Sequence, residues 1–283
     1  MPTETMSEQT ENKSAAKPDV RYQRLQRILK KYGKVIVAYS GGVDSAFLLK
    51  AAVDTLGREK VLGAIGVSES LARSEYRQAC ALAEGMGATV EVVYPREMSD
   101  PDYQKNPSNR CFYCKVELYR LLTDLARRRG YGAVLCGTNA DDLGDFRPGL
   151  RAAKEYGVAS PLEEAELRKA DIRQLSKRLG LETWDKPAQP CLASRVPYGM
   201  EITTERLRQS EEGEEFLRGL GLRELRVRHH GELVRIEVPA ERIKELTAPE
   251  RREGIVEFFK KLGFTYVSLD LQGFRSGSGN EVL

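Results

Sequence analysis

The segment VIVAYSGGVDSAFLLKAAV, residues 35–53, decides the fold of this chain. An apolar run ends at a glycine-rich turn, and a pattern typical of a helix follows directly. Glycines let the backbone approach an anion closely, and the unpaired N–H groups and the dipole of a helix start favour negative charge. Ser40 and Ser45 can add hydroxyl donors. The turn therefore predicts a phosphate site, although a plain glycine turn capped by serine and aspartate would have the same sequence.

The turn lacks the lysine of the common nucleotide-binding P-loop, because SGGVDS (residues 40–45) does not match G-x-x-x-x-G-K-S/T. The missing lysine argues against transfer of a γ-phosphoryl group. Asp44 would repel a phosphate unless a cation lay between them, so we expect bound Mg²⁺ at Asp44.

Short apolar runs alternate with amphipathic segments from about residue 20 onward. Strands separated by helices predict parallel β-α-β units, and hence an α/β fold with a doubly wound parallel sheet. Strands are expected at 34–40, 60–67, 88–95 and 133–139, and helices at 22–33, 45–57, 74–87, 114–130 and 171–181. Ligands of such sheets bind at the carboxyl ends of the strands, which is where the 40–45 turn lies.

The pattern of the chain changes after about residue 203. Residues 222–239 predict a hairpin with a turn near Gly231, followed by a helix at roughly 240–262 and a strand at 266–271. We expect three parts: a disordered tail over 1–19, a nucleotide-binding domain over 20–202, and a small α+β domain over 203–283 for substrate binding or oligomerisation.

Composition narrows the class of protein. A net charge of +3 with 31% charged residues argues against a broad nucleic-acid surface. No apolar run reaches membrane-spanning length, and the polar N-terminus predicts no signal peptide. The expected location is the cytoplasm, where the five cysteines would be reduced and available for metal binding or reaction.

S-G-G-x-D-S at residues 40–45 resembles the PP-loop of the ATP pyrophosphatases, whose domain is similar to that of the adenine nucleotide alpha hydrolases. GTNADD, residues 137–142, resembles the second turn of these enzymes. In this superfamily ATP is cleaved to AMP and pyrophosphate, and AMP activates a substrate oxygen as a leaving group. The resemblance implies that the adenine is held around residues 66–68. It also implies that ATP is bound by Ser40, Gly41, Gly42, Val43, Asp44, Ser45 and Gly137.

Four further motifs, in order along the chain, make the resemblance more specific: DFRPGLRAA (145–153), CLASRVPYG (191–199), RIEVP (235–239) and LDLQGFRSG (269–277). Together they resemble the LarE family, over about residues 22–278. These ATP-dependent sulfur transferases build the nickel-pincer nucleotide cofactor of lactate racemase. The resemblance implies a mononucleotide substrate, pyridinium-3,5-biscarboxylic acid mononucleotide, whose carboxylates become thiocarboxylates. It also implies a homohexamer built as a trimer of dimers.

The five cysteines differ in their surroundings. Cys80 lies in a predicted helix and Cys136 in a predicted strand, where each would be a small buried apolar residue. Cys111 and Cys114 form a C-x₂-C motif, and Cys191 lies in a predicted loop. Closed zinc sites need four ligands, and the two histidines, His229 and His230, belong to the other predicted domain. Three thiolates instead suit a [4Fe–4S] cluster with one open iron that could hold an extra sulfide.

The resemblance leaves two sources of sulfur open. Members of the family that have only the counterpart of Cys191 sacrifice its sulfur and keep dehydroalanine. Here the C-x₂-C pair is also present, which resembles the three-cysteine branch thought to recycle sulfur through a cluster supplied with sulfide or another donor. We therefore expect Cys111, Cys114 and Cys191 to be catalytic and to hold the cluster, with a sacrificial Cys191 or a zinc site as alternatives.

An anionic substrate requires cationic partners. Arg226 and Arg228 alternate along a predicted strand, so both should lie on one face of it. That face either contacts the substrate or is simply solvated. The family resemblance implies that Arg226 and Arg275 bind the substrate phosphate. Three carboxylates match positions that bind a divalent cation in relatives, or else are ordinary surface groups: Glu214, Glu237 and Glu245.

Three other functions remain as alternatives. A tRNA thiolation enzyme could share the PP-loop and the cysteines, but it would need a broad basic surface. An ammonia-using synthetase would leave the cysteines idle, and a non-catalytic nucleotide-binding module would release no pyrophosphate.

Overall fold

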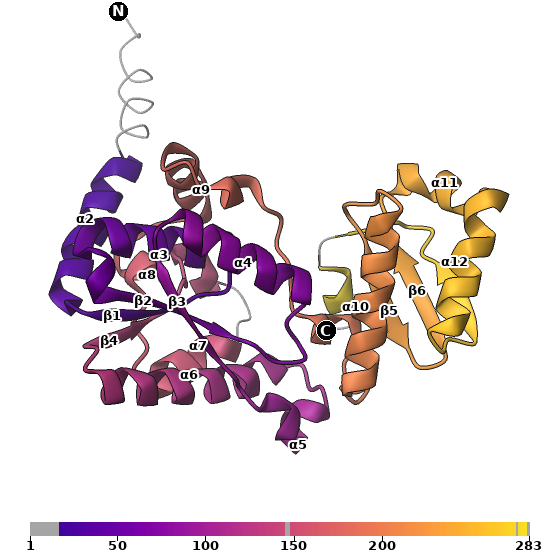
Figure 1. The fold of residues 1–283 in the computed structure, drawn as a ribbon, viewed down its shortest axis with the longest axis horizontal. Coiled ribbons are helices and arrows are strands. Elements are labelled where there is room, and N and C mark those ends of the chain that lie inside the picture. Colours follow the sequence, from indigo (N-terminus) through magenta and orange to yellow (C-terminus); the bar gives the residue numbers. More distant parts are fainter. Residues whose placement is uncertain (1–16, 145–147, 276, 282–283) are drawn as a thin grey trace, which may run out of the picture. The chain divides into compact units, whose positions relative to one another are not determined.

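The computed structural model describes residues 17–144, 148–275 and 277–281 (Figure 1). The chain divides into two compact units. The first comprises Met1–Val67, Arg73–Pro95 and Cys111–Gln189, and the second comprises Ser68–Ala72, Arg96–Arg110 and Pro190–Leu283. Most of the predicted disordered tail, 1–16, lies outside the described residues, and helix α2 (Lys17–Tyr32) begins three positions before the predicted start of the first domain. The predicted domain functions and bounds stay a prediction.

The first unit contains a parallel four-stranded sheet in the order β3-β2-β1-β4. Its strands are β1 (Val35–Ala38), β2 (Val61–Gly66), β3 (Thr89–Val93) and β4 (Ala133–Leu135). Val35 of the central strand aligns with Val61 on one side and Ala133 on the other, so the carboxyl ends of β1, β2 and β4 lie at one edge. The predicted α/β fold with a parallel sheet is confirmed.

Helices cover both faces of this sheet. Helices α3 (Val43–Leu56) and α4 (Arg73–Gly85) lie on one side, and α6 (Arg110–Arg129) lies on the other (Figure 1). The core under α6 joins apolar residues of three strands with Tyr119 and Leu122 of the helix. Such burial of apolar side chains is the main stabilising term of the unit. The other helices of this unit are α7 (Pro148–Glu155), α8 (Pro161–Glu164) and α9 (Lys169–Arg178).

The second unit contains a three-stranded sheet in the order β5-β6-β7. Strands β5 (Arg226–His230) and β6 (Leu233–Glu237) form the predicted hairpin around Gly231, which has a φ of 71°. Strand β7 (Tyr266–Leu269) pairs parallel to β6. Its helices are α5 (Pro101–Gln104), α10 (Thr204–Gly219), α11 (Ile243–Thr247) and α12 (Pro249–Lys261).

Two features of this unit differ from the sequence prediction. Helix α10 was not predicted, because its apolar residues are sparse and Gly213 lies inside it. The single helix expected at 240–262 is split into α11 and α12, because Pro249 forces Ala248 into an extended conformation with ψ of 137°. None of the described helices combines the length and apolar character needed to cross a membrane.

Candidate active site

The 40–45 turn connects β1 to helix α3 and is shaped by close backbone packing. Gly41 has a φ of 71°, and a Cβ added to it would lie 2.5 Å from Cβ of Ala79. The Oγ atoms of Ser40 and Ser45 lie 3.0 Å apart, and Ser45 Oγ donates to the carbonyl of Gly42. A Cβ on Gly137 would lie 3.0 Å from the backbone nitrogen of Ser45, so the segment after β4 passes directly beside the helix start. This glycine-lined helix start fits the phosphates of a nucleotide.

Asp44 occupies the first turn of α3 and is only partly neutralised. Its Oδ2 lies 2.6 Å from Nζ of Lys169, whereas its Oδ1 is buried and accepts no hydrogen bond from the described residues. The backbone N–H of Lys169 donates to Oδ2 of Asp141, in the 137–142 turn. An unpartnered carboxylate oxygen beside a phosphate site fits the oxygen ligands that Mg²⁺ prefers.

Lys169 was missed in the sequence. It begins helix α9, where a cation is disfavoured by the helix dipole, and that unfavourable placement was the available signal. The structure explains why a lysine is tolerated at this helix start, because the Asp44 carboxylate offsets the positive charge of Lys169.

The C-x₂-C motif lies in the first unit, at the start of α6. Cys111 is exposed and Cys114 is half-buried, and their spacing of three places them on one side of the helix. Lys115 follows directly, with its Nζ 5.6 Å from the ring centre of Tyr119. The Tyr119 hydroxyl raises the pKa of Lys115 above its ordinary value against the effect of burial, and the Cys114, Cys136 and Cys111 thiols add to it. Lys115 therefore places a positive charge beside the C-x₂-C motif.

Cys191 lies in the second unit, exposed, at the start of the 3₁₀ turn Leu192–Arg195. Asn106 of the same unit donates from Nδ2 to the carbonyls of Val196 (3.1 Å) and Pro197 (2.8 Å). Its Oδ1 accepts from Nη1 of Arg110 at 2.9 Å. Residues 106–110 of the second unit are thus tied to the segment that follows Cys191.

The remaining two cysteines differ in burial. Cys136 is buried, as expected, with its Sγ 3.3 Å from Oγ1 of Thr138. Cys80 is half-buried, so the expectation that it would be buried is wrong.

Arg226 and Arg228 are both buried, which rules out a solvated strand face. Nε and Nη2 of Arg228 each donate to one oxygen of Glu237 at 3.0 Å. Burial, together with the charge of Arg195, lowers the pKa of Arg226 to about 10. The Arg226 guanidinium lies 5.1 Å from the ring centre of Phe274, the residue before Arg275.

Arg275 is half-buried, and it donates to Glu281 and to the carbonyl of Gly273. Of the two predicted substrate-binding arginines, Arg226 thus contacts the ring of Phe274, and Arg275 directly follows Phe274 in the chain.

The three predicted cation ligands are each paired with arginine. Both oxygens of Glu214 are bound by Arg195, and those of Glu237 by Arg228. Glu245 pairs with Arg242 and Arg251. Within the described residues of either unit, no group of three or more His, Cys, Asp or Glu side chains could hold a metal ion.

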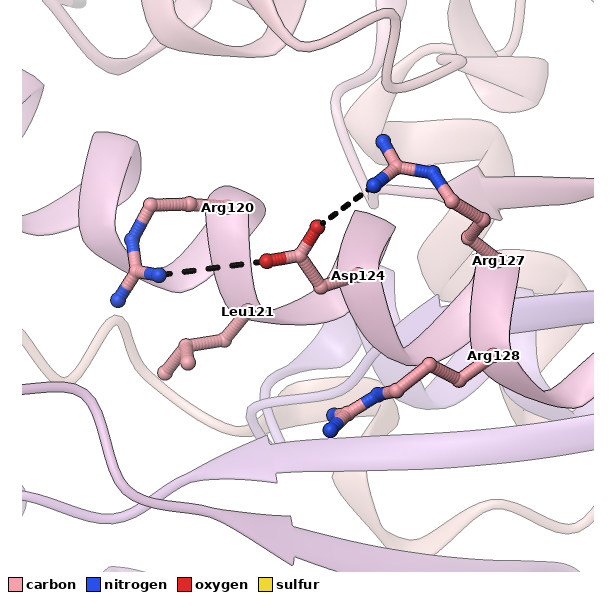
Figure 2. A pocket seen from close by; sticks show the side chains of 5 residues that line it. All are labelled: Arg120, Leu121, Asp124, Arg127 and Arg128. Atoms are coloured by element: carbon pink, nitrogen blue, oxygen red, sulfur yellow. Dashed lines mark hydrogen bonds and ion pairs between the residues drawn. The ribbon is translucent and has the colours of Figure 1, made fainter.

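Two hollows lie in the first unit. One, of about 780 Å³, reaches Gly41 and is lined by α4 and residues 179–186. The other, of about 340 Å³, lies along α6, where Figure 2 shows Arg120 and Arg127 reaching Asp124 from opposite sides. Both arginines are already paired with the Asp124 carboxylate.

Known proteins resemble this chain along most of its length. A pyridinium-3,5-bisthiocarboxylic acid mononucleotide synthase of Lactiplantibacillus plantarum is 40% identical over 255 residues, which are 90% of this chain and 92% of that protein. The chain belongs to the family of this synthase. Uncharacterized proteins of Synechocystis and Methanocaldococcus jannaschii are also similar, at 45% identity (93% of this chain, 98% of that protein) and 32% (86% and 91%). The NAD synthase family model matches residues 20–105.

Membership of this LarE-like family establishes the class of chemistry. The chain is an ATP-dependent PP-loop enzyme, and the segment matched by the NAD synthase model contains the whole 40–45 turn. The similarity to the synthase covers nine-tenths of the chain and therefore includes residues of both compact units.

Proposed function

We propose that this enzyme adenylates the carboxylates of pyridinium-3,5-biscarboxylic acid mononucleotide and replaces a carboxylate oxygen with sulfur. The observation that carries the proposal is the similarity to the synthase of the bisthiocarboxylic product, which extends through both units. In the first step a carboxylate oxygen attacks the α-phosphorus of ATP and pyrophosphate leaves. In the second a sulfur nucleophile attacks the activated carbonyl carbon and AMP leaves with the oxygen.

The first unit supplies the groups for adenylation. The N–H groups at the start of α3 hold the phosphates. Gly41 and Gly137 have no side chains, which leaves room for the close packing of the backbone around this helix start. Asp44 would hold Mg²⁺ through its unpartnered Oδ1, and the bound ion would neutralise charge on the leaving pyrophosphate. Lys169 holds Asp44 in position from the other oxygen.

The second unit binds the substrate. Arg226, which lies against the ring of Phe274, and Arg275, the residue after Phe274, pair with the phosphate of the mononucleotide. Arg228 is held by Glu237 and supports the strand face from which Arg226 extends. Assembly into a hexamer remains a prediction.

Cys111, Cys114 and Cys191 would be the ligands of a [4Fe–4S] cluster, which would supply the sulfur. Two of the thiols are exposed, Lys115 adds a positive charge beside the C-x₂-C motif, and Asn106 holds the segment that follows Cys191. Such a cluster would supply an open iron for an additional sulfide. The exposed thiol of Cys191 also supports a second candidate, in which Cys191 itself gives up its sulfur.

Anaerobic reconstitution tests the proposal. The protein should carry about four irons per chain, turn over repeatedly when sulfide is supplied, and keep the mass of Cys191. A Cys191 that is one H₂S lighter after a single turnover, with no iron bound, would establish the sacrificial donor instead. Absence of pyrophosphate release with ATP, Mg²⁺ and the mononucleotide would overturn the function itself.

A further inference from the structure

A buried ion pair lies directly under the Cys191 loop in the second unit. Nε and Nη2 of Arg195 donate to the two oxygens of Glu214 at 2.8 and 3.0 Å. The side chains are 3% and 1% exposed, so both charges have been removed from water. A pair buried this deeply is costly unless its remaining donors are also satisfied.

The remaining donor of Arg195 is directed at the backbone around Cys191. Its Nη1 donates to the carbonyl of Pro190 at 2.6 Å and to that of Cys191 at 3.1 Å. These two carbonyls belong to the two peptide planes that flank the Cys191 Cα. Because peptide units are planar and rigid, holding both planes fixes φ and ψ of Cys191 and with them the direction of its Cα–Cβ bond.

The second of these planes is also held at its other end. The N–H of Leu192 donates to the carbonyl of Ser70 at 2.8 Å. Ser70 is itself anchored, because its hydroxyl donates to the buried carboxylate of Glu97 at 2.9 Å. The backbone of Cys191 is thus clamped from two sides, while its thiol is left exposed.

Glu214 is fully engaged in this arrangement. Arg218 Nη2 also donates to its Oε2, at 2.8 Å, and the Val227 N–H lies 3.4 Å from its Oε1. Burial would raise the pKa of Glu214, but the charge and hydrogen bonds of Arg195, with the charge of Arg218, hold it below its ordinary value. A divalent cation at this carboxylate would have to displace guanidinium groups and would be repelled by them.

We propose that Glu214 is a positioning residue that fixes Cys191 through Arg195, and that it does not hold a divalent cation. The importance of this for sulfur transfer rests on the proposed function, since it assumes that Cys191 handles the sulfur. The clamp itself can be tested without any turnover. It requires only that the Cys191 backbone loses its restraint when Glu214 loses its charge.

The first experiment measures amide hydrogen exchange in the full chain for Glu214→Gln. Exchange in the peptide that covers residues 190–196 should rise on the order of tenfold or more, because the charge-assisted pair that orients Arg195 is lost. Glu212→Gln is the matched control on the same helix, since Glu212 makes an exposed pair with Arg208. Exchange of 190–196 should stay at the wild-type rate in the control. Unchanged exchange in Glu214→Gln would overturn the proposal.

Arg195→Lys provides a second variant in case Glu214→Gln folds poorly. Lysine keeps the charge, but a single ammonium lacks the planar fork that reaches Glu214 and the two carbonyls together. It should raise exchange at 190–196 while strands β5 and β6 remain protected. A rise spread equally over β5 and β6 would indicate a purely structural role and would also overturn the proposal.

Metal binding and kinetics complete the test. Wild type and Glu214→Gln should bind the same amount of Mn²⁺ in the absence of ATP, and loss of one equivalent in the variant would make Glu214 a metal ligand. In turnover, kcat for thiocarboxylate formation should fall in Glu214→Gln while KM for the mononucleotide stays constant. If the wild type forms no thiocarboxylate at all, the proposed function fails, but the exchange result still decides whether the clamp exists.

Discussion

The 40–45 turn and the Cys191 loop hold their functional groups by different means. At the turn, the backbone forms the site, with a left-handed Gly41, an open helix start and a close approach from Gly137. At the Cys191 loop, a buried side-chain ion pair holds the backbone in place. The phosphate-facing backbone of the first site therefore depends on the absence of side chains at Gly41 and Gly137, and the second site depends on a charge pair between Arg195 and Glu214.

This difference determines what each site tolerates. The turn should be sensitive to any added atom at its glycines and insensitive to charge changes that involve neither Asp44 nor its partner Lys169. The second unit should be sensitive to the removal of single charges and to protonation. Four substitutions or conditions test this contrast.

The largest effect is expected for Gly41→Ala. The new Cβ would lie 2.5 Å from that of Ala79, and a φ of 71° adds strain of roughly 1–2 kcal/mol for any L residue. Pyrophosphate release should fall below detection. Gly85→Ala is the control, because no atom lies within 4 Å of its added Cβ and its φ is not positive. Near-normal pyrophosphate release by Gly41→Ala would show that backbone shape is not what forms this site.

Asp44→Asn should reduce pyrophosphate release on the order of a hundredfold. The amide removes the charge that pairs with Lys169 and that is proposed to hold Mg²⁺, while the size of the side chain is kept. Asp54→Asn on the same helix, which breaks only the exposed pair with Lys50, should release pyrophosphate normally. Equal rates of pyrophosphate release by the two variants, at saturating Mg²⁺, would show that Asp44 has no role in adenylation.

The same contrast explains what the sequence could predict. Strands β1–β4 and the 40–45 turn follow from contiguous patterns, because their periodicity and their glycines are local. Lys169, Arg195 and Asn106 were missed, because each acts on a partner distant in the chain, and single residues of this kind have no local pattern. Helix α10 was missed for a related reason, since it buries polar residues such as Glu214 whose partners come from other segments.

Arg275→Ala should raise KM for the mononucleotide on the order of tenfold, with little change in KM for ATP. A charge-assisted contact to a phosphate is worth about 1.5–3 kcal/mol, and the half-buried Arg275 can exchange its contact with Glu281 for the substrate. Arg208→Ala, which removes an exposed arginine of α10, is the control. A selective loss of ATP affinity in Arg275→Ala would assign this arginine to the nucleotide site instead.

The smallest effect is expected from mild acid, and it should be confined to the second unit. The chain has two histidines, and both lie at the end of β5. His229 is 4% exposed, its Nδ1 accepts from the Gly231 N–H, and its Nε2 faces Oε1 of Gln209, so it is held as the neutral Nε2–H tautomer. Burial, with the nearby charge of Arg206, lowers the pKa of His229 to about 4, and burial also lowers that of His230.

The unfolded chain binds a proton at His229 near pH 6.5, whereas the folded chain binds it only near pH 4. The contribution of neutral His229 to the free energy of unfolding is therefore complete above pH 6.5. It is lost as the pH falls towards 4, by about 1 kcal/mol for His229 between pH 7 and 5.5. Hydrogen exchange of β5 and β6 should therefore accelerate relative to that of β1 and β2 over this range, after correction for intrinsic rates. The difference should shrink in His229→Gln, whose amide can still face Gln209 but cannot titrate. Equal acid sensitivity of the two sheets, or the same pH dependence in His229→Gln, would show that His229 is not its source.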